Sequence, residues 1–247
     1  MIRPPAQPGT VYLAGSGPGD PELLTLRALR LLESADVILP DDLVSDEILA
    51  LAHSGANIIP VGKRCGQPRI TQAGIHALML EHASPRSEPP RSVLRLKSGD
   101  PLIFGRAGEE MAFLREHRIP FEIVPGITSA FAAAASLKTP LTDRTSASKL
   151  ILATAHHAAG KVSLPSWEGA FPEASTLVLY MPGRDFTELA ADLIGSGISP
   201  DTPCVAVSKA STPHQQTTAT TLAGLSTARV GPAPLLLLIG HAIQPEL

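Results

Sequence analysis

Residues 11–35, VYLAGSGPGDPELLTLRALRLLESA, run from an apolar strand through a glycine-rich turn into a helix. Val11–Ala14 is apolar and short enough to be one strand, and Gly15–Gly19 follows it directly. Beyond that turn, apolar residues recur with helical period, and Asp20 followed by Pro21 is typical of a helix start. A strand that turns at glycines into a helix predicts one unit of an α/β fold.

The same alternation continues along the chain. Further strands are predicted at Val37–Leu39, Ile58–Val61, Val93–Leu96, Phe121–Val124, Leu150–Thr154, Thr176–Tyr180, Val205–Val207 and Leu235–Ile239, with a threonine-rich edge strand at Gln215–Thr221. Helices are predicted at Gln72–Ala83, Ala107–His117, Thr128–Leu137 and Phe186–Ile194. The pattern predicts an α/β protein with mostly parallel sheets in two α/β domains, residues 1–118 and 119–247. We expect the active site in a cleft between the domains.

Composition excludes several classes of protein. Of the 247 residues, 44% are hydrophobic and 17% are charged, which is typical of a globular chain. The net charge of −3 argues against nucleic-acid binding, and no apolar run approaches the ~20 residues of a membrane helix. The first residues lack the apolar stretch of a signal peptide. Cys65 and Cys204 are far apart, so we expect neither a disulfide framework nor a metal site, and we expect a cytoplasmic protein.

Four turns at strand ends are candidates for a ligand site: Gly15–Asp20, Leu96–Arg106, Val124–Ser129 and Tyr180–Gly183. Ligands of α/β proteins bind at the carboxyl ends of the strands. Each turn also has a purely structural interpretation, as a helix cap, a tight turn or a core methionine. The first turn fits the dinucleotide-binding pattern badly, because Asp20 occupies the place of the third glycine. This disfavours a nicotinamide-dependent oxidoreductase.

Several segments together, in this order, resemble the uroporphyrinogen-III C-methyltransferases of the tetrapyrrole methylase family. They are VYLAGSGPGDPELLTL (11–26), VGKR (61–64), LRLKSGDPLIFGR (94–106), PFEIVPGITS (120–129) and PLT (140–142). The resemblance implies S-adenosylmethionine as cofactor, S-adenosylhomocysteine as its product, no metal, a tetrapyrrole substrate and a homodimer. It implies two successive methylations of uroporphyrinogen III to precorrin-2, in corrinoid or sirohaem biosynthesis. A methylase of a later precorrin and a non-catalytic ligand-binding paralogue are the alternatives.

The resemblance also assigns roles to individual residues. The cofactor-binding set is Pro18, Ser98, Gly99, Asp100, Ile103, Thr128, Ser129, Met181 and Ala210. The catalytic set, which would move the proton that leaves after methylation, is Asp41, Lys63 and Glu109. Cations are needed for the carboxylates of the substrate, and the expected set is Arg106, Arg64 and Arg144, with Arg95, Lys97 and Lys149 nearby. For Arg106 and Glu109, three residues apart, a plain salt bridge is the open alternative.

The chain departs from the family pattern at several places. Ser98 replaces a glycine, which removes easy access to a positive φ. Further departures are Pro40, Asp42, Asp143, Thr145, Ser146 and Ala155, whereas His156 keeps its place. Most of them lie in segments assigned to the substrate, so we expect the cofactor site to match the family better than the substrate site does.

Overall fold

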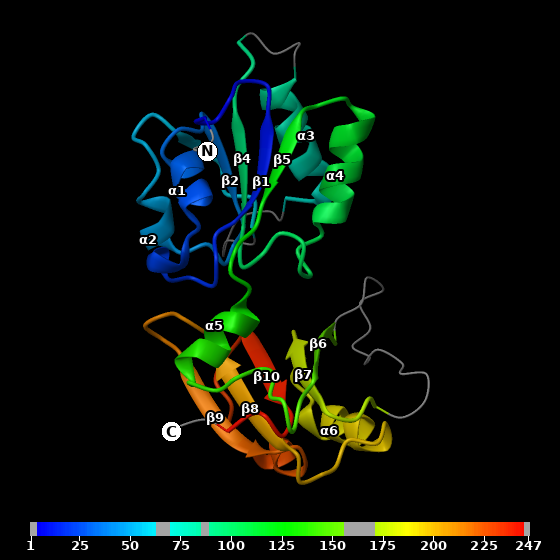
Figure 1. Ribbon diagram of the computed structural model, residues 1–247. Helices are drawn as coiled ribbons and strands as arrows, with labels where there is room; N and C mark the ends of the chain where they lie inside the picture. The colour runs from blue at the N-terminus through cyan, green and yellow to red at the C-terminus, as the bar shows by residue number, and fades with distance from the viewer. Residues whose placement is uncertain (1–3, 63–69, 85–88, 156–170, 245–247) are drawn as a thin grey trace. The chain divides into compact units, whose positions relative to one another are not determined.

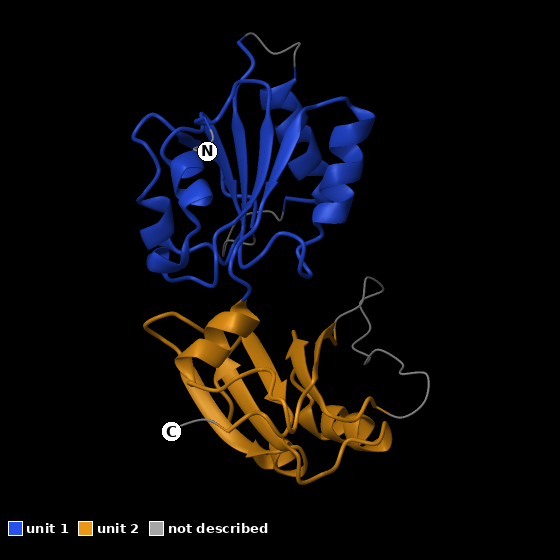
Figure 2. Cartoon of the chain, in the orientation of Figure 1, with its two compact units in different colours: residues 1–128 blue, residues 129–247 orange. Residues whose placement is uncertain are grey.

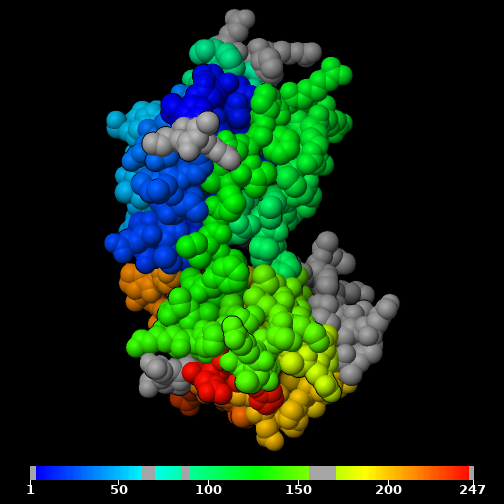
Figure 3. Space-filling model, viewed as in Figure 1, coloured from blue at the N-terminus to red at the C-terminus, as the bar shows by residue number. Residues whose placement is uncertain are grey.

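The computed structural model describes residues 4–62, 70–84, 89–155 and 171–244 (Figure 1). The chain divides into two compact units, residues 1–128 and 129–247 (Figure 2). The division follows Thr128 rather than Arg118, because β5 (Phe121–Val124) pairs with β1 (Val11–Gly15) inside the first sheet. In the space-filling view, the blue N-terminal part of unit 1 lies against the green segment that carries β5 (Figure 3).

Unit 1 contains a five-stranded sheet in the order β3-β2-β4-β1-β5. The remaining strands are β2 (Val37–Pro40), β3 (Asn57–Ile58) and β4 (Val93–Lys97). Every pair is parallel, so the prediction of a parallel sheet is confirmed for this unit. The predicted strand Ile58–Val61 is shorter and begins earlier than expected. Because all strands point the same way, the turns that follow them lie along one edge of the sheet.

Helices cover both faces of this sheet (Figure 1). One face packs against α1 (Leu26–Leu32) and α2 (Asp46–Leu49), and the other packs against α3 (Gln72–Ala83) and α4 (Ala107–Glu116). Side chains of β4 alternate between the faces, so Leu94 and Leu96 join the α1 side. Val93 joins the α3 and α4 side, which places Arg95 and Lys97 on that side as well.

The helix expected after the first turn is divided in two. Asp20 accepts a hydrogen bond from the Glu22 amide and caps a 3₁₀ turn, Pro21–Leu23. Thr25 then caps α1 by accepting from the Ala28 amide. The start signal at Asp20 is therefore real, but it belongs to the shorter element.

Unit 2 begins with α5 (Ser129–Ser136) and contains a second five-stranded sheet, in the order β6-β7-β10-β8-β9. Its elements are β6 (Lys149–Thr154), β7 (Ser175–Tyr180), α6 (Phe186–Gly195), β8 (Pro203–Ser208), β9 (Gln216–Thr221), a 3₁₀ turn (Ala223–Thr227) and β10 (Leu235–Ile239). The predicted edge strand is confirmed as β9.

The prediction of a mostly parallel sheet is wrong for unit 2. Only β6 and β7 pair in parallel, and the other three pairs are antiparallel. Only residues 209–215 join β8 to β9, whereas a parallel neighbour needs a crossover of roughly a dozen residues. On one face, α6 packs on the apolar core. In the described part of the chain, no helix is long and apolar enough to cross a membrane.

Candidate functional site

Three turns at the carboxyl edge of the parallel sheet are tied together by hydrogen bonds. The Ser16 amide donates to the Lys97 carbonyl at 2.7 Å. Gly17 and Gly99 exchange two backbone hydrogen bonds of 3.2 and 2.7 Å. The Gly126 amide donates to Oδ2 of Asp100 at 3.0 Å. The turns after β1, β4 and β5 therefore form one layer.

Glycine is required at the centre of this layer. A Cβ added at Gly15 would lie 2.4 Å from the Gly99 carbonyl oxygen, and one added at Gly126 would lie 2.1 Å from the same atom. Gly99 itself has a φ of 66°. We call Gly15, Gly99 and Gly126 the glycine cradle. No side chain fits at Gly15 or Gly126, so the three turns pack backbone against backbone.

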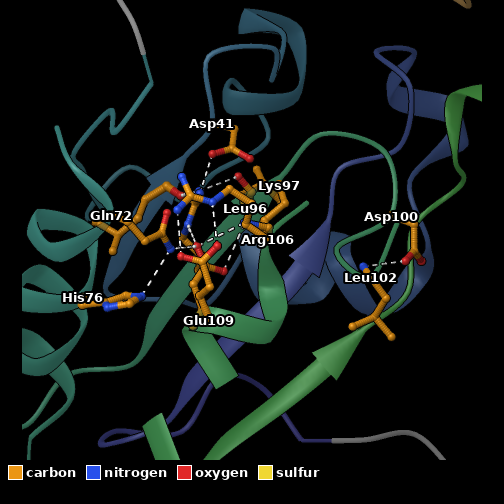
Figure 4. Close-up of polar contacts among 12 residues, drawn as sticks. Asp41, Gln72, His76, Leu96, Lys97, Asp100, Leu102, Arg106 and Glu109 are labelled. Carbon is orange, nitrogen blue, oxygen red and sulfur yellow. Dashed lines mark hydrogen bonds and ion pairs between the residues drawn. The ribbon is translucent and has the colours of Figure 1, made fainter. Parts of the chain in front are cut away.

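Asp100 holds this layer from the side. Its Oδ1 accepts from the Leu102 amide at 2.8 Å (Figure 4), and its Oδ2 accepts from the Gly126 amide. Each carboxylate oxygen has a second lone pair, so these bonds leave acceptor capacity for a ligand. The structure thus gives Asp100 a structural role, and its predicted contact with the cofactor stays a prediction.

The other predicted cofactor residues of unit 1 surround the cradle. Pro18 stands between Gly17 and Gly19, which have φ values of 71° and 137°. Ser98 is not among the described residues with positive φ, so serine costs nothing at this position. The Ile103 amide donates to the Asp100 carbonyl at 3.2 Å and closes the same turn.

Two predicted cofactor residues stand on either side of the division between the units. Thr128 is buried and ends unit 1, and Ser129 opens α5 in unit 2. The connection between the units therefore starts directly after the strand and turn that carry Gly126.

In unit 2, Met181 and Ala210 follow β7 and β8. Both strands run antiparallel to β10, so their carboxyl ends lie at the same edge of the sheet. Met181 is 46% exposed and has a φ of 49°. Ala210 lies between Lys209 and Ser211, whose φ values are 49° and 62°. Left-handed backbone at non-glycine residues is strained, and such strain concentrates at functional sites.

A cluster of charged side chains lies between the parallel sheet and α4 (Figure 4). It consists of Asp41, Arg95, Lys97 and Glu110, and we call it the charged cluster. Lys97 Nζ donates to both oxygens of Glu110 at 3.1 Å, and Arg95 Nε donates to Oε1 at 3.0 Å. Arg95 also donates to Asp41. Two positive and two negative side chains balance, which is the usual condition for burying charge.

The cluster corrects one expectation. Arg95 and Lys97 were expected among the cations near the substrate, but both are buried and both pair with Glu110. Burial and the nearby Arg95 charge lower the pKa of Lys97 below its usual value, against the opposite effect of Glu110.

Sequence reasoning missed Glu110, although a signal was present. It lies three residues after Ala107 and four before Leu114, which are the other buried residues of α4. Helical spacing alone therefore places its carboxylate on the buried face.

Asp41 directly follows β2 and is the exposed member of the cluster, with 32% of its side chain accessible. Its amide donates to the Leu96 carbonyl at 2.9 Å. A Cβ added at Gly62 would lie 2.4 Å from the Asp42 amide nitrogen, so the chain before residue 63 packs against Asp42. Lys63 and Arg64 lie outside the described residues, as does His156, and their predicted roles stay predictions.

Arg106 stands at the start of α4, as predicted, with a φ of 56°. Its Nε and a terminal nitrogen donate to the two oxygens of Glu109 at 2.8 and 2.7 Å, and both side chains are about half exposed (Figure 4). The hydrogen bonds from Arg106 lower the pKa of Glu109. The structure therefore contains the salt bridge, and the exposure of both groups leaves them accessible to a ligand.

The substituted segment around Arg144 forms a closed turn. Oδ1 of Asp143 accepts from the amides of Thr145 and Ser146, each at 2.9 Å, and from both of their hydroxyl groups. These hydrogen bonds hold the pKa of Asp143 well below its usual range. Arg144 is exposed in this turn, in unit 2. The departures at 143, 145 and 146 thus satisfy one another.

Comparison with known proteins shows where this arrangement recurs. The family model for tetrapyrrole (corrin/porphyrin) methylases matches residues 10–226. A uroporphyrinogen-III C-methyltransferase of Paracoccus denitrificans is 44% identical over 97% of this chain and 83% of its own length. Siroheme synthase 2 of Halorhodospira halophila is also 44% identical over 97% of this chain, which spans only 48% of that protein.

A solved structure agrees with these relatives. The uroporphyrin-III C-methyltransferase of Thermus thermophilus, complexed with S-adenyl homocysteine, superposes with a TM-score of 0.78. It is 38% identical to this chain, and the match covers 94% of this chain and 92% of that one. The glycine cradle, the order of the motifs and these matches lead to one conclusion: the chain belongs to the tetrapyrrole methylases.

Proposed function

We propose that this chain is an S-adenosylmethionine-dependent C-methyltransferase that methylates uroporphyrinogen III twice and yields precorrin-2. The observation that carries the proposal is the glycine cradle, which lies at the same edge of the parallel sheet as the Asp41 carboxylate. The names of the Paracoccus and Thermus relatives support the substrate, and the bound S-adenyl homocysteine of the Thermus protein supports the cofactor.

The residues of the described chain fit this cofactor. At Gly15 and Gly126 any Cβ would meet the backbone of a neighbouring turn, so the three turns pack backbone to backbone and place no side chain there. We assign cofactor contacts to Pro18, Ser98, Gly99, Asp100, Ile103, Thr128, Ser129, Met181 and Ala210. The cofactor supplies an activated methyl group on a sulfonium. The described residues include no group of three or more His, Cys, Asp or Glu that could hold a metal ion.

Methyl transfer to carbon depends mainly on alignment of the two reactants, and the protein's own chemistry concerns the proton that must leave afterwards. Asp41 is a partly exposed carboxylate fixed at a strand end, and we assign it the role of base. Lys63 and Glu109 complete the proposed proton-transfer set.

The substrate carries carboxylates, which arginine binds through paired hydrogen bonds. Arg106, Arg64 and Arg144 are the proposed partners. Of these, the structure describes Arg106 and Arg144. Arg106 is the better placed of the two, because its present partner Glu109 is exposed. An exposed ion pair is worth at most about 1 kcal/mol, so exchange of Glu109 for a substrate carboxylate costs little.

The direct test is anaerobic incubation with uroporphyrinogen III and S-adenosylmethionine, followed by mass analysis of the product. We expect two added methyl groups. A product formed only from a later precorrin would favour the neighbouring methylase activity, and binding of S-adenosylhomocysteine without turnover would identify a non-catalytic paralogue.

The substrate side is tested with Arg106→Lys, which keeps the charge and loses the paired geometry. We expect a higher KM for the tetrapyrrole with unchanged affinity for S-adenosylhomocysteine. Normal kinetics would leave the salt bridge as the only role of Arg106.

We also propose that the chain acts as a homodimer in the cytoplasm. Sedimentation equilibrium tests the first part, since the dimer would have twice the 25.8 kDa of one chain. Cell fractionation tests the second.

A further inference from the structure

We propose that Arg95 and Glu110 are positioning residues for Asp41: Glu110 fixes the guanidinium of Arg95, and Arg95 fixes the Asp41 carboxylate. This inference rests on the proposed role of Asp41 as a base.

Hydrogen bonds hold the guanidinium of Arg95 in a single orientation. Its Nε donates to Glu110, and one terminal nitrogen donates to the carbonyl oxygens of Leu39 and Leu96 at 3.0 and 3.3 Å. The other terminal nitrogen donates to Asp41. Four of the five N–H groups of an arginine are thus used, in a rigid planar group.

Arg95 holds both the end of β2 and the side chain of Asp41. Leu39 belongs to β2, and Asp41 is the residue that follows this strand. One guanidinium therefore fixes the end of β2 through a backbone carbonyl and the Asp41 carboxylate through a charged hydrogen bond. Lysine has the same charge but cannot make these contacts at once.

Glu110 fixes Arg95 in turn. Its side chain is fully buried and accepts from Arg95 and Lys97, and from Gln72 Nε2 at 3.4 Å. Gln72 is the first residue of α3, so Glu110 joins β4, α3 and α4 at one point. A carboxylate held by three side chains cannot rotate away.

The side chains of the charged cluster differ in how far they are exposed. The side chains of Arg95, Lys97 and Glu110 are 3%, 2% and 0% exposed, whereas that of Asp41 is 32% exposed. The chain of contacts therefore leads from buried groups to the one exposed carboxylate of the charged cluster. A misplacement of about 1 Å in a catalytic group costs about 100-fold in rate, which is the size of effect that such a support prevents.

A double-mutant cycle tests the inference, using kcat with uroporphyrinogen III for Arg95→Lys, Asp41→Asn and the combined variant. We expect Arg95→Lys to lower kcat about 10- to 100-fold, with KM and the Kd for S-adenosylhomocysteine changed less than twofold. In the Asp41→Asn background, the same change should have no further effect, because the group that it positions is gone. An equal loss in both backgrounds would show a merely structural role and overturn the inference.

Arg27→Lys is the matched control. Arg27 also lies in unit 1, donates to both oxygens of a carboxylate, Glu122, at 3.2 and 2.9 Å, and donates to the Pro4 carbonyl at 2.6 Å. Like Arg95, it bonds a carboxylate and a backbone carbonyl, but it has no link to Asp41, so the kcat of Arg27→Lys should stay at the wild-type value. If Arg95→Lys melts below the assay temperature, Glu110→Gln provides the same cycle with a side chain of the same shape.

The outcomes separate this inference from the proposed function. A low kcat in Asp41→Asn with a normal kcat in Arg95→Lys removes the positioning role and keeps Asp41 as the base. A normal kcat in Asp41→Asn removes both.

Discussion

The two units bury different kinds of polar group. Besides the hydroxyls of Ser16, Ser92 and Thr128, the described part of unit 1 buries three charged side chains, Arg95, Lys97 and Glu110, between the middle strand of a wholly parallel sheet and α4. Among the described residues of unit 2, the buried polar side chains are all hydroxyls, namely Thr139, Ser175, Thr176, Thr202 and Ser208. The difference indicates a division of labour. The residues proposed for acid–base chemistry that the structure describes, Asp41 and Glu109, both belong to unit 1.

The largest expected effect tests the buried charges. Glu110→Ala leaves Arg95 and Lys97 buried with Asp41 as the one remaining carboxylate of the charged cluster, so we expect the free energy of unfolding to fall by about 3–5 kcal/mol. Urea denaturation measures the loss. Glu116→Ala, at the exposed end of the same helix, should stay within about 0.5 kcal/mol of wild type. Similar losses in the two variants would show that the cluster is not a special feature of unit 1.

The next effect tests the glycine cradle. A methyl group at Gly126 meets the Gly99 carbonyl, so Gly126→Ala should lower stability by about 1–3 kcal/mol and weaken binding of S-adenosylhomocysteine. Calorimetry measures the binding and thermal melting the stability. Gly108→Ala is the control, because a Cβ there meets nothing within 4 Å in α4; it should add about 0.5–1 kcal/mol of stability. Unimpaired binding by Gly126→Ala would separate the cradle from the cofactor.

The parts of the fold that sequence predicted are those with a local signal. Val93–Leu96 is an apolar run of strand length, and Gln72–Ala83 has helical period, and both are present. Helix α2, Asp46–Leu49, is a single turn, too short for any period to show. Strand direction in unit 2 was wrong because an apolar run such as Leu235–Ile239 has the same pattern whichever way it runs.

In the candidate site, too, the parts with a local sequence signal were predicted and the others were not. The strand-end turns were predicted, because glycine and proline mark them in the sequence. The pairing of Arg95 with Glu110 was not predicted, because these residues lie on different elements that only the fold brings together. In the sequence, Arg95 and Lys97 are simply two cations near a candidate ligand-binding turn. The alternation of Val93, Arg95 and Lys97 along one face of β4 is the signal that was available.

A smaller effect, of opposite sign, is expected in unit 2. In the described chain, the Thr176 hydroxyl is fully buried and has no hydrogen-bond partner. Thr176→Val keeps the shape and removes the unsatisfied group, so stability should rise by about 1 kcal/mol. Thr139→Val is the comparison, since its hydroxyl donates to Ala242 and accepts from Gln244; it should lose about 1 kcal/mol. A loss in both variants would mean that the Thr176 hydroxyl is satisfied.

The smallest effect tests exposed charge against buried charge in unit 1. Arg106→Gln should lower stability by at most about 1 kcal/mol at neutral pH and low salt. Arg106 lowers the pKa of Glu109 in the folded chain, so this stabilisation is present above the unfolded pKa and disappears as pH falls through the folded pKa. Denaturation of both proteins between pH 7 and pH 2 measures it. A gap that persists in acid or in 1 M salt would assign the effect to packing.

The strand order of unit 1 also has a consequence for synthesis of the chain. The inner strand β1 pairs with β5, and the paired residues Val11 and Phe121 are 121 − 11 = 110 positions apart. In unit 2, β8 and β9 are joined by residues 209–215 alone. Pairing of distant segments requires closure of long loops, which slows folding. During synthesis, β1 therefore waits for almost the whole of its unit, and its apolar residues are open to other partners until β5 emerges.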